Sequence, residues 1–318
     1  MDLMSSINLK KYFSINKNVF SKKGYLKAVD GISINIKSNK VFALVGESGC
    51  GKSTVARLLI RLLEPSEGMI LYKSHDLKTL NDKEIMNFRR SVQMVFQDPF
   101  ASLNPRMRIG DILEEPLLVH KIGTKSERKD KVAELLMKVG LSSDVINRYP
   151  HEFSGGQRQR ICIARALTLS PEMIIADEPL SALDVSIQAQ IINLFQELKR
   201  EYSLSMLFIS HDLNVVHYLS DEVGVMYLGR IVEQGDTSEL YNNPLHPYSR
   251  LLISSTPRLK GRGREKKTTV IYDVPSPINI PQGCSFHPRC PDIFEPCKSL
   301  QPEMVNYKGR LISCHLYK

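Results

Sequence analysis

The stretch GESGCGKST, Gly46 to Thr54, decides the fold of this chain. It follows the apolar run VFALV and precedes KSTVARLLIRLL, whose apolar residues recur at three- and four-residue spacing until Pro65 and Gly68. The order is therefore strand, glycine-rich turn and helix. Glycines in such a turn let backbone N–H groups surround a phosphate, and the helix N-terminus adds a favourable potential. The motif in this context predicts a nucleotide-binding site.

Individual residues of this loop have distinct expected roles. Lys52 is expected to reach the β- and γ-phosphates, and the hydroxyl of Ser53 is expected to ligate Mg²⁺. Cys50 lies beside a helix N-terminus that could lower the pKa of its thiol, so we expect alkylation of Cys50 to block ATP binding. The predicted ATP contacts from the loop are Gly46, Glu47, Ser48, Gly49, Cys50, Gly51, Lys52, Ser53 and Thr54.

Beyond the loop, the chain alternates short apolar runs with helical patterns. EMIIADEP and LSMLFISHD indicate buried parallel strands, and VSIQAQIINLFQELKREY indicates a helix between them. From Asp98 to Leu169 the pattern is mostly helical. RLKGRGREKK, Arg258 to Lys267, is basic and glycine-rich, which is typical of an exposed linker. The chain thus predicts a parallel α/β core interrupted by a helical insertion.

The composition of the chain limits the classes of protein to which it can belong. With 43 basic and 34 acidic residues the formal charge is +9, which suits nucleic acid, anionic lipid or phosphorylated ligands without choosing among them. No apolar run approaches the roughly 18 to 20 residues that span a bilayer, and the N-terminus lacks the apolar core of a signal peptide. We therefore expect an intracellular protein whose six cysteines are reduced, which favours metal ligation or burial over disulfides.

Two carboxylates end the predicted strand MIIADEP. Asp177 and Glu178 should emerge at the carboxyl edge of the sheet, where α/β proteins place ligands. Adjacent strand residues point to opposite sides, so Asp177 can face Mg²⁺ while Glu178 acts as general base on a water that attacks the γ-phosphate. Two solvated charges at a strand end are the alternative, and the phosphate loop argues against it.

The stretch HEFSGGQRQRICIARAL begins the last predicted helix of the insertion. Ser154 is a good helix N-cap, and Gly155 and Gly156 permit close approach of an anion. Together with the motifs above, this stretch resembles the ATP-binding subunits of ABC transporters, whose signature motif SGGQ matches Ser154 to Gln157. The resemblance implies a head-to-tail dimer, in which the signature of one subunit covers the ATP held by the loop of the other. ATP binding would close this dimer and hydrolysis would release it.

Three further motifs match the same family. The resemblance implies that Gln97 in VFQDP senses Mg²⁺ and joins the core to the helical insertion. It implies that Asp184 in SALD lies in a loop linking the two composite sites, and that His211 in ISHD contacts the γ-phosphate and the attacking water. An aromatic ring near the N-terminus should stack on adenine. LKKYF offers Tyr12 or Phe13, and family spacing favours Phe13.

Other stretches resemble one branch of this family. QDPFASLNPRMRIGDILEEPL, NPLHPYSRLL and the terminal cysteines resemble the F-type ATP-binding subunits of dipeptide and oligopeptide importers. The resemblance implies that ATP hydrolysis powers peptide import through two membrane permease subunits, with a D-type ATP-binding subunit completing a head-to-tail heterodimer. An extracytoplasmic peptide-binding protein would select the cargo. Permease helices would dock near Gln97, and the chain would lie peripherally at the cytoplasmic face of the cell membrane. Related importers carry nickel or glutathione, so peptide is a family-level inference.

Four cysteines lie near the C-terminus: Cys284, Cys290, Cys297 and Cys314, separated by five, six and sixteen residues. Zinc ribbons prefer paired cysteines with about two to four intervening residues. Four separated thiolates can instead hold a [4Fe–4S] cluster, and the peptide-importer resemblance points to the same cluster. Zinc and unligated thiols stay open as alternatives. A tail this short can hardly build its own core, so metal binding would supply its folding energy.

The sequence therefore predicts an α/β fold with an ABC-type phosphate-loop ATPase core, an inserted helical subdomain and a small C-terminal cysteine-rich metal-binding domain. The core should span residues 1–97 and 170–235 with N-terminal antiparallel strands, the helical subdomain 98–169, and the C-terminal extension 236–318.

Two rival functions remain. A soluble ABC ATPase acting on nucleic acid or ribosomes would suit the charge, but the single phosphate loop, the single signature and the lack of sustained heptads favour a chain without a nucleic-acid partner. A metal-dependent assembly subunit with a degenerate nucleotide site is disfavoured by the intact Lys52, Glu178 and His211.

Overall fold

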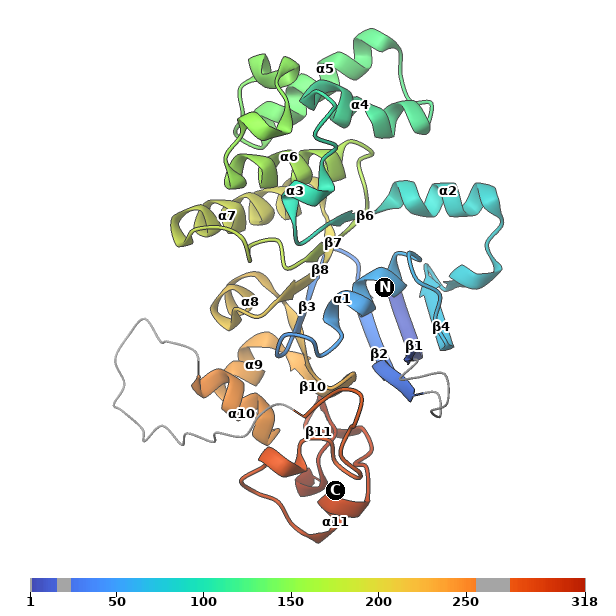
Figure 1. Cartoon of the computed structure of the whole chain (residues 1–318), viewed down its shortest axis with the longest axis vertical. Coiled ribbons are helices and arrows are strands. Elements are labelled where there is room, and N and C mark those ends of the chain that lie inside the picture. The colour runs from blue at the N-terminus through green and yellow to red at the C-terminus, as the bar shows by residue number, and fades with distance from the viewer. Residues whose placement is uncertain (1, 16–23, 256–274, 318) are drawn as a thin grey trace.

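A central sheet of eight strands organises the molecule (Figure 1). The computed structural model describes residues 2–15, 24–255 and 275–317. The strand order is β11-β12-β10-β9-β3-β8-β7-β6, and the strands from β9 to β6 in this order run parallel. Their bounds are β3 (Val41–Val45), β6 (Val92–Val95), β7 (Met173–Asp177), β8 (Ser205–Ser210), β9 (Glu222–Tyr227), β10 (Arg230–Asp236), β11 (Val305–Tyr307) and β12 (Arg310–Ile312). Every residue of β3, β7 and β8 is buried, which explains why these strands read as continuous apolar runs.

Alternate residues of β3 face two different cores. Val41, Ala43 and Val45 belong to one hydrophobic cluster, whereas Phe42 and Leu44 belong to another. Helices from the second half of the chain pack in the first cluster, and the helix after the phosphate loop packs in the second. These helices are α7 (Val185–Tyr202), α8 (Leu213–Leu219) and α9 (Thr237–Asn242) for the first and α1 (Lys52–Leu59) for the second. The sheet is thus covered on both faces, as parallel sheets require.

A smaller antiparallel sheet covers the second core. Its strand order is β2-β1-β4-β5, with antiparallel pairing at each step. The strands are β1 (Asp2–Ile15), β2 (Gly24–Lys37), β4 (Glu67–Tyr72) and β5 (His75–Asp76), followed by the 3₁₀ helix Leu77–Thr79 and α2 (Asp82–Ser91). The N-terminal antiparallel strands therefore form a sheet separate from the parallel one.

Helix α1 is shorter than its apolar pattern predicts. It ends at Leu59, although the periodicity continues to Pro65. The N–H groups of Leu62 and Leu63 both donate to the carbonyl of Arg57, at 2.8 and 3.1 Å. Arg61, which precedes Leu62, has φ +58°, so an arginine takes the left-handed position that glycine usually supplies at a helix end.

The inserted helices lie at one end of the long axis, at the top of Figure 1. They are α3 (Pro99–Ser102), α4 (Ile109–Val119), α5 (Lys125–Lys138) and α6 (Gly155–Leu167), with 3₁₀ helices at Ser143–Asn147 and Pro150–Glu152. A capping box begins α5 at Thr124 and another begins α6 at Ser154. Both helix starts are therefore specified locally by the sequence.

The C-terminal segment lies at the opposite end and joins the central sheet (Figure 1). Strand β12 pairs with β10, with Ile312 opposite Glu233. Glu233 is fully buried and accepts hydrogen bonds from the backbone of Leu245 and His246 and from Arg310. The remaining elements are α10 (Pro247–Ser254), the 3₁₀ helix His287–Arg289, α11 (Glu295–Ser299) and the 3₁₀ helix His315–Tyr317.

The predicted linker, 258–267, lies outside the described residues. The division into segments 1–97 with 170–235, 98–169 and 236–318 stays a prediction. No helix within the described residues has the length and apolarity needed to span a bilayer.

Candidate functional site

The glycine-rich turn between β3 and α1 fits closely against neighbouring strands. A Cβ on Gly46 would lie 2.2 Å from the carbonyl oxygen of Met226, and one on Gly51 would lie 2.0 Å from that of Ala28. Gly51 also has φ +108°, which side chains rarely adopt. The backbone of the turn is therefore held by β2 and β9 in a shape that only glycine permits.

Lys52 is buried at the centre of this turn, with a side chain 3% exposed. Its ammonium donates hydrogen bonds to the carbonyl oxygens of Gly46 and Glu47, at 2.9 and 3.1 Å. It also lies 3.6 Å from a carboxylate oxygen of Glu178. The ammonium thus joins the loop to the end of β7.

Ser53 and Asp177 form the second link between the loop and β7. The hydroxyl of Ser53 donates to Asp177 at 2.8 Å. Burial is the main cause that raises the pKa of Asp177 above its ordinary value, although the hydrogen bond from Ser53 acts in the opposite direction. A hydroxyl and a carboxylate so placed are oxygen ligands of the kind that Mg²⁺ prefers.

The carboxylate of Glu178 contacts three residues that the sequence predicted for the site. Gln97 donates to its Oε2 at 3.4 Å, and Nδ1 of His211 lies 3.3 Å from the same oxygen. Lys52 faces its other oxygen. Glu178 has φ +46°, an unusual conformation for a residue with a side chain and one that clusters at functional sites. The carboxylate is therefore oriented by the left-handed backbone of Glu178 after β7 and by its contacts with Gln97 and His211.

A cavity of about 250 Å³ opens beside the loop. Its lining includes Phe13, the loop residues Ser48 to Thr54, Gln97 and Glu178. Tyr12 is engaged elsewhere, because its hydroxyl donates a 2.5 Å hydrogen bond to Asp30. Of the two aromatic residues considered for adenine stacking, Phe13 is the one placed at the cavity.

Part of this lining was not predicted from the sequence. Lys27, Ala28, Gly229 and Pro277 also border the cavity. Pro277 comes from the C-terminal segment, far along the chain from the loop. The clearest signal that was missed is YLGR, where Gly229 has φ +83° at a tight turn against β2.

The signature residues lie apart from this cavity. Ser154 caps α6 by accepting from the N–H of Gln157, whose side chain accepts in turn from the N–H of Ser154. Ser154, Gln157 and Asp184 are exposed, and none is among the described residues that line the cavity. The structure therefore brings together Lys52, Ser53, Gln97, Asp177, Glu178 and His211, and leaves Ser154 to Gln157 and Asp184 outside.

The prediction of a lowered thiol pKa at Cys50 was wrong. Cys50 is only 5% exposed. Burial raises the pKa of its thiol, and the nearby ammonium of Lys52 offsets only part of this effect. Removing a thiolate from water therefore outweighs the favourable potential at the start of α1.

The four C-terminal cysteines line one cavity. Cys284, Cys290, Cys297 and Cys314 border it together with His315 and other residues. Within residues 2–15, 24–255 and 275–317, no group of three or more His, Cys, Asp or Glu side chains could hold a metal ion. The described cysteine side chains are therefore not arranged as the ligands of a metal, whether the zinc or the iron–sulfur cluster considered from the sequence.

Two further features belong to the cysteine segment. His315 is 7% exposed, and its Nε2 lies 2.9 Å from the carbonyl of Leu300. Its buried Nδ1 has no hydrogen-bond partner among the described residues. Gly283, with φ +72°, brings the backbone so close that a Cβ there would lie 2.5 Å from the carbonyl of Cys297. The turn at Gly283 therefore packs the backbone closely beside Cys297.

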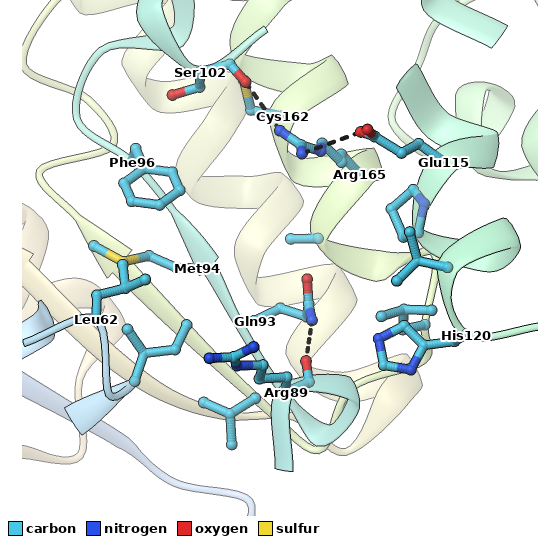
Figure 2. A pocket seen from close by; sticks show the side chains of 16 residues that line it. Leu62, Arg89, Gln93, Met94, Phe96, Ser102, Glu115, His120, Cys162 and Arg165 are labelled. Atoms are coloured by element: carbon cyan, nitrogen blue, oxygen red, sulfur yellow. Dashed lines mark hydrogen bonds and ion pairs between the residues drawn. The ribbon is translucent and has the colours of Figure 1, made fainter. Parts of the chain in front are cut away.

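A second cleft lies between the central sheet and the inserted helices. Its cavity of about 530 Å³ is bordered by β6, α4 and α6. Figure 2 shows Phe96, Met94 and Leu62 on one side, and the ion pair of Arg165 with Glu115 on another. Apolar and charged side chains thus share one concave surface next to Gln97.

Comparisons with known proteins agree with this geometry. A family model described as ABC transporter matches residues 29–181, and one described as Oligopeptide/dipeptide transporter, C-terminal region matches residues 232–297. The chain is 53% identical over 315 residues to the oligopeptide transport ATP-binding protein AppF of Bacillus subtilis, covering 98% of this chain and 96% of that protein. It is 49% identical over 313 residues to the dipeptide transport ATP-binding protein DppF of Escherichia coli, covering 98% and 93%.

Solved structures agree at the level of the fold and of the ATP-binding cassette. A dimeric structure of a post-hydrolysis state of the ATP-binding cassette MJ0796 bound to ADP and Pi matches with a TM-score of 0.66 and 28% identity. It covers 74% of this chain and 98% of that chain.

Proposed function

The chain belongs to the family of ATP-binding subunits of oligopeptide and dipeptide ABC transporters, and we propose that it hydrolyses ATP with its own loop and strand-end residues and the signature of a second subunit. ATP hydrolysis in this family is coupled to transport. One observation supports the residue assignment above all others. Lys52, Gln97 and His211 converge on the carboxylate of Glu178 beside a cavity that the phosphate loop borders.

The proposed chemistry is attack of water on the γ-phosphate. Glu178 takes the proton of the water as general base, while His211 orients the water and the phosphate. Lys52 stabilises the negative charge that develops on the transferred phosphoryl group, and ADP leaves with the β-phosphate in the loop. Ser53, Asp177 and Gln97 would hold Mg²⁺, which would offset negative charge on the nucleotide when bound.

A second ATP-binding subunit would complete the site. Ser154, Gln157 and Asp184 are exposed, and they lie outside the cavity lining together with Gly155 and Gly156, so this motif can face another subunit. The start of α6 offers backbone N–H groups and a helix dipole to an anion. We propose a head-to-tail pairing with a D-type subunit, in which these residues act in trans. Val185, next to Asp184, is 82% exposed, which suits burial in such an interface.

The cleft of Figure 2 is the proposed contact with the membrane permease subunits. It joins the inserted helices to the end of β6, two residues before Gln97. A permease helix seated there would contact the elements that carry Gln97 and, through α6, the signature. This location would place the chain peripherally at the cytoplasmic face of the membrane, with a peptide-binding protein on the other side.

We also propose a [4Fe–4S] cluster at Cys284, Cys290, Cys297 and Cys314. The four thiols border one cavity, and their spacing in the sequence lacks the close pairs of zinc ribbons, which supports this group. When bound, the cluster would supply metal–thiolate bonds that hold the C-terminal segment together. This makes residues 236–318 a cysteine-rich metal-binding extension of the core formed by 1–97 and 170–235, with 98–169 as the helical subdomain.

Peptide import is tested by uptake of labelled di- and oligopeptides in cells that lack this subunit. Cells complemented with the wild-type chain should regain uptake, and cells complemented with Glu178→Gln should not. Nickel or glutathione uptake restored in place of peptide uptake would assign the cargo to a related importer. Magnesium-dependent ATPase activity stimulated by nucleic acid or ribosomes, without any uptake, would support the soluble alternative.

A further inference from the structure

The C-terminal cysteine segment reaches the phosphate loop through one arginine. Arg289 precedes Cys290 and donates hydrogen bonds to both carboxylate oxygens of Glu47, each at 2.8 Å. Glu47 is the second residue of the phosphate loop and lies 242 positions earlier in the chain. Bidentate pairing of a guanidinium with a carboxylate is both strong and directional, so it fixes the loop in orientation as well as in distance.

The ion pair is shielded from water. The side chain of Arg289 is 7% exposed and that of Glu47 is 25% exposed. The guanidinium carbon lies 5.8 Å from the ring centroids of Tyr227 and of Phe286. Tyr248, whose ring centroid lies 5.3 Å from that of Phe286, accepts a 3.0 Å hydrogen bond from the N–H of Glu47. The backbone and the carboxylate of this loop residue are therefore both held by the C-terminal part of the chain.

The position of Arg289 depends in turn on the cysteines. The N–H of His287 donates to the carbonyl of Cys284 at 2.9 Å, and the N–H of Cys290 donates to that of His287 at 3.3 Å. The N–H of Cys284 donates to the carbonyl of Cys297 at 2.9 Å. Arg289 thus lies on a compact turn whose two ends are thiols of the cysteine cavity. Movement of the backbone at either cysteine would therefore move the guanidinium.

On the loop side, Glu47 belongs to the phosphate cradle through its backbone. Its carbonyl oxygen and that of Gly46 accept the hydrogen bonds of Lys52. A shift of Glu47 would therefore change the orientation of the ammonium that is proposed to bind the phosphates. Arg289 itself is not among the described residues that line the nucleotide cavity, so its effect on the nucleotide would be transmitted through Glu47.

We propose that Arg289 is a positioning residue for the phosphate loop, and that it makes nucleotide affinity depend on the integrity of the cysteine segment. This inference rests on the proposed ATPase function. Because the contact orients the cradle and touches no reacting atom, its loss should weaken nucleotide binding and raise KM, while kcat at saturating ATP changes little.

The test is equilibrium titration of the full chain with a fluorescent ATP analogue and Mg²⁺. Arg289→Met and Glu47→Gln should each weaken binding about five- to tenfold. The double variant should bind no more weakly than the weaker single variant, because both changes break the same contact. Arg289→Lys should recover only part of the affinity, since an ammonium cannot pair with both oxygens in the same fork geometry.

Arg250→Met is the matched control. The guanidinium of Arg250 bonds to Pro244, Asp292 and Tyr317, all within the C-terminal part of the chain. Its loss should leave nucleotide affinity within about twofold of wild type. Cys290→Ser should weaken binding in the wild-type background and add nothing in the Arg289→Met background.

Wild-type affinity in Arg289→Met, or an equal loss in Arg250→Met, would overturn the inference. If Arg289→Met does not fold, Arg289→Lys decides by the same comparison, with unchanged affinity counting against the inference. A wild-type chain that binds no ATP analogue in the presence of Mg²⁺ would instead reject the proposed function, so the two failures are distinguishable.

Discussion

Nζ of Lys52 lies 3.6 Å from Oε1 of Glu178, and the two side chains are only 3% and 13% exposed. Oε2 of the same carboxylate faces Gln97 and His211. One oxygen of the proposed base therefore meets a cation, and the other meets the two residues expected to sense Mg²⁺ and the attacking water. A change at Glu178 should consequently affect hydrolysis far more than binding.

Glu178→Gln should lower kcat by at least about a hundredfold, because an amide cannot accept the proton of the attacking water. ATP affinity should be retained, since Lys52 is then released from its carboxylate partner. Steady-state ATPase assays and nucleotide titration measure the two effects separately. Glu172→Gln is a suitable control, because Glu172 precedes the same strand and forms only an exposed ion pair with Lys73. Normal hydrolysis in Glu178→Gln would remove Glu178 from the role of base.

Phe13→Ala should weaken ATP and ADP binding by about tenfold, the usual effect of losing one stacking ring. The matched variant is Tyr12→Phe, because the hydroxyl of Tyr12 donates to Asp30 and does not serve the cavity. Tyr12→Phe should lower the melting temperature and leave nucleotide affinity unchanged. Unchanged affinity in Phe13→Ala at wild-type stability would identify Phe13 as a core aromatic only.

Alkylation of Cys50 by N-ethylmaleimide should be slow at neutral pH. Burial raises the pKa of this thiol above its ordinary value of 9.0, so the reactive thiolate is scarce. The rate of alkylation can be followed by mass spectrometry of the labelled peptide. This rate should still increase with pH at pH 9.0, the ordinary pKa of a cysteine thiol. Once attached, the group should block ATP binding because Cys50 lines the cavity. Cys50→Ser should be resistant to this inhibition, and a rate plateau near neutral pH would contradict the effect of burial.

The sequence could predict site residues that lie close together on one strand or turn. It could not predict contacts between residues that are far apart along the chain. The spacing of Lys52 and Ser53 follows from the geometry of one turn, and Asp177 and Glu178 follow from the end of one strand. Glu47 and Arg289 meet only because the C-terminal segment folds back onto the loop. No local pattern in HPRCP indicates such a contact, since the prolines and cysteine explain the stretch equally well.

The same distinction explains the two sequence predictions that were wrong. Helix α1 ends at Leu59 because Arg61 adopts a left-handed conformation. The sequence has no glycine or proline at this position that would indicate a helix end. The pKa of Cys50 depends on how completely neighbouring elements bury it, and that degree of burial is a tertiary property. Both errors arise where tertiary packing outweighs a local tendency.

Asp221 should make the stability of the core depend on pH. Burial alone would raise its pKa, but hydrogen bonds from Lys199, Lys40 and the N–H of Val41, each at 2.8 Å, outweigh burial and lower it. A carboxylate with a lowered pKa stabilises the folded state above the pKa of the unfolded chain, near 4, and this stabilisation is lost as the pH falls through the folded value.

Asp221→Asn should therefore reduce the free energy of unfolding by about 1–3 kcal/mol at neutral pH, because Lys40 and Lys199 lose their charged partner. The difference from wild type should shrink as the pH falls from about 4 through the lower pKa of the folded state, below which the carboxylate is protonated in both states. Denaturant titrations at several pH values measure this. A difference that persists unchanged in acid would mean that Asp221 acts through its shape and packing.

The four C-terminal cysteines should bind an iron–sulfur cluster. Protein purified without oxygen should be brown and contain about four irons and four sulfides per chain, because four thiols border one cavity and the Nδ1 of His315 is buried beside them. Cys297→Ser should lose colour and iron together. Visible absorption with iron, sulfide and zinc analysis decides the matter. A colourless protein with stoichiometric zinc would reject the cluster. Iron loss that also weakens ATP binding, with Arg289 in place, would link the cluster to the loop through Glu47.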